Sequence, residues 1–387
     1  MSAPDQITRT AVLALIVAAA MFWLMLDNFT KDMVDYLLPW LDHIRATGPV
    51  ASFAAPFGNY TPPYLYLLAI ASLAAPFVHP VILIKLLSLA GTFMLAAAVW
   101  RLLVALDTPL PGRKALIVMA LPSVALNSDL FAQCDAMWAA ACVMGLTAAV
   151  GRRHAAMLAW CGLAVAIKLQ PVFSAPLIVA LLIGRQVPWR LWAIAPLTFV
   201  AAMVPAVLMG WPLADIATIY FRQADWSPAL SMNAPNIWAI AQALPLIGAL
   251  PLTGLAMASA IGASAWLIAR FAHRPPAREQ VIAAALLVTL VTVGLLPRMH
   301  ERYFFLADVL ALVLALAHGN RRNWIIAGLV EAGSMLGLSA YLVGIDGLAV
   351  IGTVAMVTAT VMVARPFLAS PANDNGLPLN SLGIYPA

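Results

Sequence analysis

The chain has 387 residues, of which 64% are hydrophobic and only 10% are charged, and its formal net charge is +5. Soluble domains carry roughly a quarter charged residues, so this composition, with a mean hydropathy of +0.94, excludes a soluble globular protein and indicates a polytopic membrane protein. The basic residues are scattered over short connections and form no stripe, so no nucleic-acid partner is expected. The three cysteines, Cys134, Cys142 and Cys161, show no metal or disulfide spacing.

Apolar segments long enough to cross a bilayer, which takes about 20 residues, follow one another along almost the whole chain. The first segment lacks a convincing small-residue cleavage site, so it is predicted to be a membrane helix and not a removed signal peptide. About twelve spans are predicted by this length, at 11–27, 80–103, 114–127, 133–150, 154–169, 171–184, 190–210, 247–270, 280–297, 302–318, 323–343 and 347–364. The predicted fold class is therefore all-α, with a single membrane domain over 1–367 and a polar tail at 368–387.

The distribution of basic residues predicts the orientation, because Lys and Arg concentrate in cytoplasmic loops. The richer set of connections carries Arg9, Arg101, Arg113, Lys114, Arg152, Arg153, Arg185, Arg190, Arg270, Arg274, Arg278, Arg321, Arg322 and Arg365. The poorer set carries Lys31, Arg45, Arg222, Arg298 and Arg302. The richer set is assigned to the inside, which places both termini in the cytoplasm.

The apolar segment 64–77 does not fit this alternation as a full span. It is short and follows Pro62 and Pro63, so it is predicted to be an interfacial or re-entrant helix within a first outer loop at 28–79. The alternative is that 64–77 does span the membrane and that a later helix is wrongly assigned.

Nearly all the unusual polar residues fall in connections assigned to the outside. The carboxylates are Asp32, Asp35, Asp129, Asp135 and Glu301, and the cations are Lys168, Arg222, Arg298, His300 and Arg302. Ionisable residues beside membrane spans are costly and are typical of functional sites. Transfer of a sugar from a lipid phosphate suits this mixture, because a carboxylate takes the proton of an acceptor hydroxyl and the cations neutralise the departing phosphate.

Several short motifs then carry a family resemblance. They are KDMVDYLLPW (31–40), FGNYTPPYLYL (57–67), the Asn-Ser…Gln-Cys-Asp segment (127–135), KLQP (168–171), NAPNIW (233–238) and MHERYF (299–304). In this order the motifs resemble those of membrane glycosyltransferases of the GT-C fold, and most closely bacterial proteins similar to the GPI-anchor mannosyltransferases. One departure is Ala132, where the family often has Gly before the Gln-x-Asp.

The resemblance implies a polyprenyl-phosphate-linked sugar donor, used on the periplasmic face of a bacterial inner membrane with inversion at the anomeric carbon. It also implies membrane-surface helices in the first outer loop. No cofactor is expected, and no metal is required in the lipid-monophosphate-dependent members. The sugar is left open, as mannose or another hexose or pentose, and so is the acceptor, which is a glycolipid or another glycan. Nothing in the sequence requires more than a monomer.

Asp32 matches the position of the family's general base best. Asp35 lies one helical turn further along and Asp135 opens a predicted span, so both remain alternatives for the base. A plainer role for Asp32 is a favourable charge at a helix N-terminus. The predicted donor-phosphate ligands are His300, Arg302, Lys168 and Arg222, and the predicted substrate contacts are Asn59, Tyr60, Gln133, Glu301 and Asn236. For Lys168, extension to the membrane surface is an equally good interpretation.

Two other classes of function stay open. A flippase or transporter of lipid-linked sugars would place polar groups near the bilayer midplane and show an inverted repeat, and neither is seen in the sequence. A non-catalytic member of a polysaccharide assembly complex would tolerate Asp32→Asn without loss of output.

Overall fold

A computed structural model describes residues 3–224 and 229–368, and over these residues the chain is almost entirely helical. The helices are α1 (Ala3–Leu24), α2 (Leu38–Thr47), α3 (Pro62–Ser72), α4 (Pro80–Ala105), α5 (Pro111–Leu116), α6 (Pro122–Asp129), α7 (Asp135–Val150), α8 (His154–Ile167), α9 (Ala175–Ile183), α10 (Ile194–Leu208), α11 (Leu213–Ala224), α12 (Ile237–Ala243), α13 (Pro245–Gly248), α14 (Thr253–His273), α15 (Val281–Leu295), α16 (Phe305–His318), α17 (Arg321–Val343) and α18 (Gly347–Leu368). The strands β1 (Ser231–Met232) and β2 (Met299–His300) form a short parallel pair. The polar tail predicted at 368–387 lies, beyond its first residue, outside the described part of the chain.

Seven of the described helical segments are long and apolar enough to cross a membrane. They cover Asp5–Leu24, Pro80–Ala105, Trp189–Leu208, Thr253–His273, Arg278–Leu295, Arg321–Val343 and Gly347–Leu368. Four shorter apolar helical segments, Asp135–Val150, His154–Ile167, Gln170–Ile183 and Phe305–His318, lie among them. The membrane character predicted from the sequence is thus confirmed, whereas the count of twelve spans stays a prediction.

The span predicted at 114–127 is not a continuous helix. Helix α5 ends at Leu116, a 3₁₀ turn follows, and α6 begins at Pro122 after an extended Leu121. A residue that precedes proline is pushed out of the α region by the proline ring. Pro122 therefore interrupts a segment whose apolar composition alone resembles that of a membrane helix.

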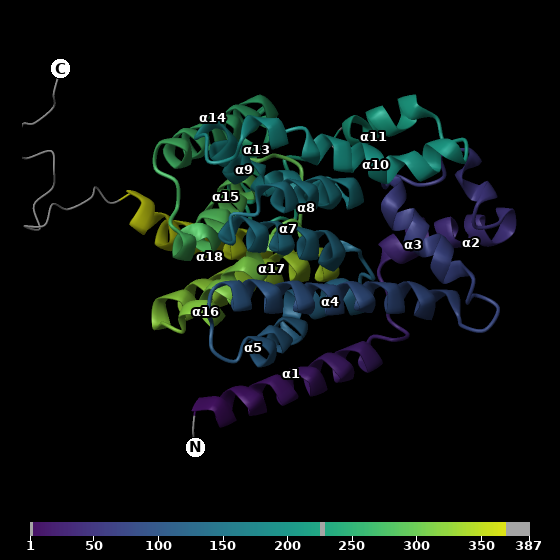
Figure 1. Cartoon of the computed structure of the whole chain (residues 1–387), viewed down its shortest axis with the longest axis horizontal. Helices are drawn as coiled ribbons and strands as arrows, with labels where there is room; N and C mark the ends of the chain where they lie inside the picture. The colour runs from purple at the N-terminus through teal and green to yellow at the C-terminus, as the bar shows by residue number, and fades with distance from the viewer. Residues whose placement is uncertain (1–2, 225–228, 369–387) are drawn as a thin grey trace, which may run out of the picture.

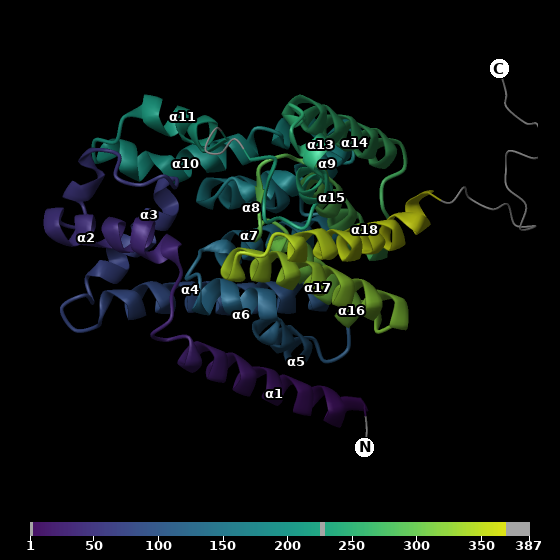
Figure 2. The same ribbon diagram turned by 180° about the vertical axis from the view of Figure 1, so that it is seen from behind.

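The long helices run across the molecule between two different ends. Figures 1 and 2 show α2 and α3 projecting at one end, while the N-terminal end of α1 and the C-terminal end of α18 lie at the other. Helix α4 packs against α7, α7 against α8, α8 against α10, and α17 against α18. Because consecutive long helices alternate in direction, their connections collect at these two ends.

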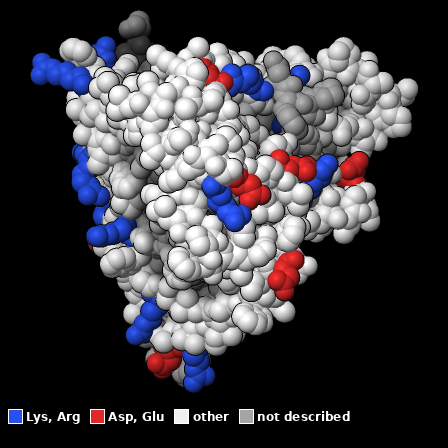
Figure 3. All heavy atoms as spheres, turned by 90° about the vertical axis from the view of Figure 1, so that its right-hand side faces the viewer, with Lys and Arg blue, Asp and Glu red and all other residues white. Residues whose placement is uncertain are grey.

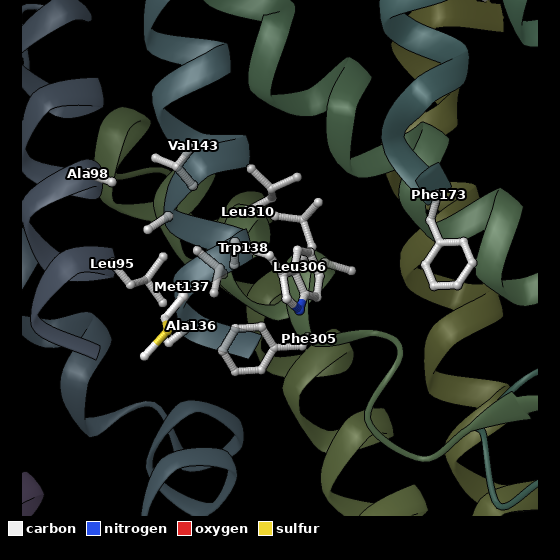
Figure 4. Close-up of a cluster of buried hydrophobic side chains, with 14 of the residues drawn as sticks. Leu95, Ala98, Ala136, Met137, Trp138, Val143, Phe173, Phe305, Leu306 and Leu310 are labelled. Atoms are coloured by element: carbon white, nitrogen blue, oxygen red, sulfur yellow. The ribbon is translucent and has the colours of Figure 1, made fainter. Parts of the chain in front are cut away.

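The core lies between α4, α7 and α16. Leu95 of α4, Met137 and Trp138 of α7, and Phe305 and Leu306 of α16 are buried together there (Figure 4). The outer helices instead expose large apolar side chains, including Ile16 and Trp23 of α1 and Leu197 of α10. Apolar side chains on the outside as well as in the core are what a lipid environment requires.

The segment 28–79 forms a compact unit of short helices at the projecting end. A π-helical turn at Met33–Leu37 continues into α2, and a 3₁₀ turn at Ala51–Ala54 precedes α3. Helix α3 has 11 residues and is not among the segments long enough to span. It packs against α2, α4, α8 and α10, so it joins this unit to the bundle.

Close packing of α8 on α10 predicts a strong effect of one methyl group. A Cβ on Gly162 would overlap the carbonyl oxygen of Ala195 and approach Thr198 Cβ to 2.9 Å. We expect Gly162→Ala to destabilise the protein by about 1–3 kcal/mol, because backbone cannot yield as a flexible side chain does. Gly262→Ala is the matched control, since a Cβ there meets nothing within 4 Å. Thermal unfolding in detergent tests the pair, and equal midpoints would contradict the packing described.

Candidate functional site

A polar cavity of about 490 Å³ opens at the end of the molecule that carries α2 and α3. Residues from five separate segments line it: Lys31, Asp32, Asp35, Tyr36, Leu37, Trp40, Asn59, Tyr60, Gln133, Lys168, Gln170, Gln223, His300, Arg302 and Tyr303. Figure 3 views this end, whose surface is largely uncharged, with acidic side chains beside basic ones at several points. The cavity brings together residues from the segment 28–79, the α6–α7 connection, the turn after α8, helix α11 and the α15–α16 connection.

Asp32 lies in the cavity wall just before the π-helical turn at Met33–Leu37. Its side chain makes no hydrogen bond that caps this helix, and a favourable charge at the helix N-terminus stays an alternative role. Arg302 Nη2 instead lies 2.9 Å from Asp32 Oδ2, and Gln133 Nε2 donates to the same oxygen at 3.4 Å. Single π-helical turns occur often at functional sites, and here the turn follows directly on Asp32.

Arg302 joins Asp32 to a second carboxylate. Its Nε lies 3.0 Å from Glu301 Oε1, and His300 Nδ1 lies 3.6 Å from Glu301 Oε2. Only 2% of the Glu301 side chain is exposed. Burial by itself raises the pKa of Glu301, but the charge of Arg302 and the contact with His300 outweigh burial and hold this pKa below its usual value. Glu301 is therefore an ionised support behind the cavity wall.

A second buried ion pair lies beside the first. Lys168 Nζ is 2.6 Å from Asp135 Oδ1, and the carboxylate also accepts from Asn127 Nδ2 at 2.8 Å and Trp138 Nε1 at 2.9 Å. Both side chains of the pair are less than a tenth exposed. Three donors on one buried carboxylate offset the loss of its hydration, so Asp135 is occupied as a partner of Lys168.

Gln133 and Tyr60 connect the two ion pairs. Gln133 Oε1 accepts from Tyr60 OH at 2.7 Å and from Lys168 Nζ at 3.3 Å, while its amide nitrogen reaches Asp32. Lys168 Nζ also lies 4.9 Å from the centre of the Tyr60 ring. Burial raises the pKa of the Tyr60 hydroxyl, with Lys168 acting in the opposite direction. Tyr60 therefore remains a neutral donor to Gln133.

Three of the predicted ligands do not line the cavity: Arg222, Asn236 and Glu301, which lies behind the wall. Arg222 is paired on its own helix, where Nη2 lies 2.5 Å from Asp215 Oδ1, and its side chain is not among those that line the cavity. Asn236 accepts from the backbone N–H groups of Trp238 and Ala239, each at 3.2 Å, and so caps α12. Helix α11 contributes Gln223 to the cavity instead, and Gln223 donates to the Asn59 carbonyl.

Other cavity residues were not predicted as site residues from the sequence. Gln170 is 7% exposed, and its Oε1 has no hydrogen-bond partner within the described residues. Tyr303 lines the wall beside His300, with ring centres 5.1 Å apart. The position of Gln170 inside the KLQP motif was the available signal, but a single polar residue in a turn has no periodicity that singles it out.

Lys85 fixes the approach of the chain to Asp32. It is fully buried on α4, and its ammonium donates to the carbonyls of Met25 and, at 2.5 Å, of Asn28. These carbonyls belong to the turn in which α1 ends, and carbonyls at a helix end lack partners within the helix. Lys85 thus anchors α1 to α4 four residues before Asp32.

Ala132, where the similar glycosyltransferases often have Gly, has a left-handed backbone conformation that favours glycine. Its φ is +52° and its side chain is fully buried. Glycine adopts this left-handed region without a steric cost, whereas other residues pay about 1 kcal/mol or more. The loop therefore keeps the turn before Gln133 even with alanine at this position.

Comparison with known proteins finds a similar fold among the solved structures. No family model and no curated protein matches the chain. Among solved structures, the chain is similar to ArnT from Cupriavidus metallidurans, crystallised with undecaprenyl phosphate bound, with a TM-score of 0.54 and 15% sequence identity. The similarity covers 95% of this chain and 76% of the ArnT chain. At this identity the match shows that the chain shares the fold of ArnT.

The buried pair Lys168–Asp135 gives a stability prediction. Lys168→Met leaves the Asp135 charge without its cation, and we expect a loss of about 3–5 kcal/mol. Asp135→Asn combined with Lys168→Met should lose less than the sum of the two single changes, because the two residues interact directly. Arg222→Met is the control, since the side chain of Arg222 is half exposed and such pairs contribute about 1 kcal/mol at most. Additive losses in thermal unfolding would contradict a direct pairing.

Proposed function

We propose that the protein is a membrane glycosyltransferase that moves a sugar from a polyprenyl-phosphate donor to an acceptor hydroxyl. The observation that carries the proposal is Asp32, a carboxylate in a polar cavity at one end of an apolar helical bundle, held beside cations by a network of buried charges. The shared fold with ArnT, a structure with undecaprenyl phosphate bound, supports a lipid-linked donor. The transferase would be an integral protein of a bacterial inner membrane with the cavity facing the periplasm.

In the proposed reaction Asp32 is the general base. It takes the proton of the acceptor hydroxyl as the hydroxyl oxygen attacks the anomeric carbon of the donor sugar. The new C–O bond forms on the face opposite the bond to the phosphate, that bond breaks, and the electron pair leaves with the lipid phosphate. The configuration at the anomeric carbon is inverted. Asp35 and Asp135 remain alternatives, but Asp135 is engaged by Lys168 and two further donors.

Arg302 and Lys168 are the cations placed to receive the leaving phosphate. Both line the cavity, and Arg302 Nη1 has no hydrogen-bond partner within the described residues. A guanidinium has five N–H donors, so Arg302 can hold Asp32 through Nη2 and offer Nη1 to a phosphate oxygen. His300 lies in the same wall. Arg222 is not part of this proposal, because Asp215 engages it away from the cavity.

A second cavity offers a place for the lipid part of the donor. It measures about 390 Å³ and shares Gln170, Gln223, His300 and Tyr303 with the first cavity. The rest of its lining is mainly apolar, with Val172, Phe173, Met232, Met257, Leu296, Pro297 and Met299. A polar chamber beside an apolar one suits a donor whose sugar phosphate is polar and whose chain is hydrocarbon.

The polar cavity also has the side chains that bind sugars. Trp40 and Tyr60 form an edge-to-face pair with ring centres 5.1 Å apart, and both line the cavity. Aromatic surfaces cover the apolar face of a pyranose or furanose ring, while Asn59, Gln133 and Gln170 supply hydrogen-bonding groups for its hydroxyls. The transferred sugar is a hexose or pentose, with mannose as the nearest expectation, and the acceptor is a glycolipid or another glycan.

Substitution of Asp32 tests the proposal. Purified wild-type protein in nanodiscs is incubated with a panel of radiolabelled polyprenyl-phosphate sugars and a membrane-lipid extract as acceptor. We expect transfer from one donor, and a loss of about 10²–10⁴-fold in Asp32→Asn, because that variant cannot accept the proton. Asp42→Asn is the matched control, since Asp42 lies on α2, pairs with Arg45 and does not line the cavity.

Other outcomes would redirect the proposal in defined ways. Transfer that survives in Asp32→Asn but fails in Asp35→Asn would move the base to Asp35. The folded wild-type protein could transfer no sugar from any donor although cells need it for glycan assembly. That result would favour a flippase or a non-catalytic assembly partner.

A further inference from the structure

A second charged cavity lies at the end of the molecule opposite the candidate site. Helix α7 begins at Asp135, beside the candidate site, and ends at Val150, which lines this other cavity. Helix α8 runs back from His154, in the same cavity, to Ile167, which precedes Lys168. The 16 residues of α7 separate the two sites by about 24 Å at 1.5 Å per residue. The two cavities therefore face opposite ends of the bundle.

The cavity measures about 350 Å³ and changes from charged to apolar with depth. Arg152, Gln186 and Arg278 are exposed and His154 is half-buried, whereas Met157 and Leu177 in the same lining are buried. The exposed polar residues come from three connections, between α7 and α8, after α9, and between α14 and α15, whereas Met157 and Leu177 come from α8 and α9. No carboxylate lines the cavity within the described residues. Such a site suits an amphiphile with an anionic head.

Arg152 has a left-handed backbone conformation. Its φ is +52°, in the left-handed region that favours glycine, and a non-glycine residue there costs about 1 kcal/mol or more. The residue directly before Arg152 is Gly151. The left-handed position itself therefore carries an arginine and not a glycine. Arg152 also lines the cavity.

We propose that this cavity binds the phosphate of an anionic phospholipid from the leaflet at that end of the molecule. Arg152 and Arg278 would contact the phosphate, and the start of the acyl chains would lie against Met157, Leu177 and their neighbours. Arg278 already contacts Asp107 Oδ2 at 3.0 Å and the Ala105 carbonyl, but a guanidinium has further N–H donors. Basic pockets between membrane helices bind anionic lipid headgroups in this way, and the apolar depth favours a lipid over free phosphate.

Arg185 offers a matched control for Arg152. It lies at the same end, follows Gly184 as Arg152 follows Gly151, and has a φ of +55°. It does not line the cavity. Replacement of either arginine by glycine removes one positive charge and relieves one left-handed residue, so the two variants differ mainly in the lost contact with the cavity.

The experiment measures thermal unfolding of the full chain in nanodiscs of phosphatidylcholine alone and of equal parts phosphatidylcholine and phosphatidylglycerol. We expect phosphatidylglycerol to raise the midpoint of the wild type, because a ligand that binds only the folded state stabilises it. Arg152→Gly should keep or raise the midpoint in phosphatidylcholine and lose the increment from phosphatidylglycerol. Arg185→Gly should keep that increment. In detergent titrations the affinity of Arg152→Gly for phosphatidylglycerol should fall about tenfold or more.

Three results would overturn the proposal. If phosphatidylglycerol still raises the midpoint of Arg152→Gly by the same amount, the lipid does not bind in this cavity. An increment lost equally in both variants would indicate attraction of the lipid by net charge alone. Full stabilisation of the wild type by inorganic phosphate in phosphatidylcholine nanodiscs would show a site for the free anion and not for the lipid.

Discussion

The pairing of Arg302 with two carboxylates is the interaction on which the candidate site depends. Arg302 contacts Asp32 from the first outer loop and Glu301 from its own connection. Charges buried at the end of an apolar bundle are tolerated only when each has a partner. Because the partners come from distant segments, the same pairing that satisfies the charges also draws the first outer loop against the turn between α15 and α16. Asp32 is positioned as a result.

The balance of charge around the cavity follows from the same constraint. The cations Lys31, Lys168 and Arg302 face the carboxylates Asp32, Asp35, Asp135 and Glu301. These pairs therefore carry no net positive charge that could attract an anionic donor. An arriving phosphate would have to use the remaining N–H donors of cations that carboxylates already hold. This arrangement holds those cations in place without a ligand, which would lower the cost of organising the site for the proposed donor.

The sequence predicted the parts of this structure that depend on hydrophobicity and on order along the chain. Long apolar segments form helices because their backbone polar groups must pair within the segment in lipid, and polar motifs collect at the helix ends for the same reason. Asp32, Asn59, Tyr60, Gln133, Lys168, His300 and Arg302 indeed line one cavity. The fold predicted from the motifs agrees with the similarity to ArnT.

Features that depend on pairing in space could not be predicted. The sequence alone does not distinguish Arg222 from Arg302. In the structure Arg222 pairs with Asp215 on its own helix, whereas Arg302 contacts Asp32. Gln170 contributes an unpartnered oxygen that no spacing indicates. The break at Pro122 follows from one proline within an apolar segment. In each case one contact or one residue determines the local structure, and composition does not indicate which one.

A double-mutant cycle between Asp32 and Arg302 tests the central claim most directly. Asp32→Asn, Arg302→Gln and the double variant are compared with the wild type by thermal unfolding in detergent. The pairing predicts a coupling free energy of about 1–3 kcal/mol between the two positions, with the double variant more stable than the sum of the single losses. Independent, additive losses would mean that Arg302 does not hold Asp32, and the organisation of the cavity described above would then be wrong.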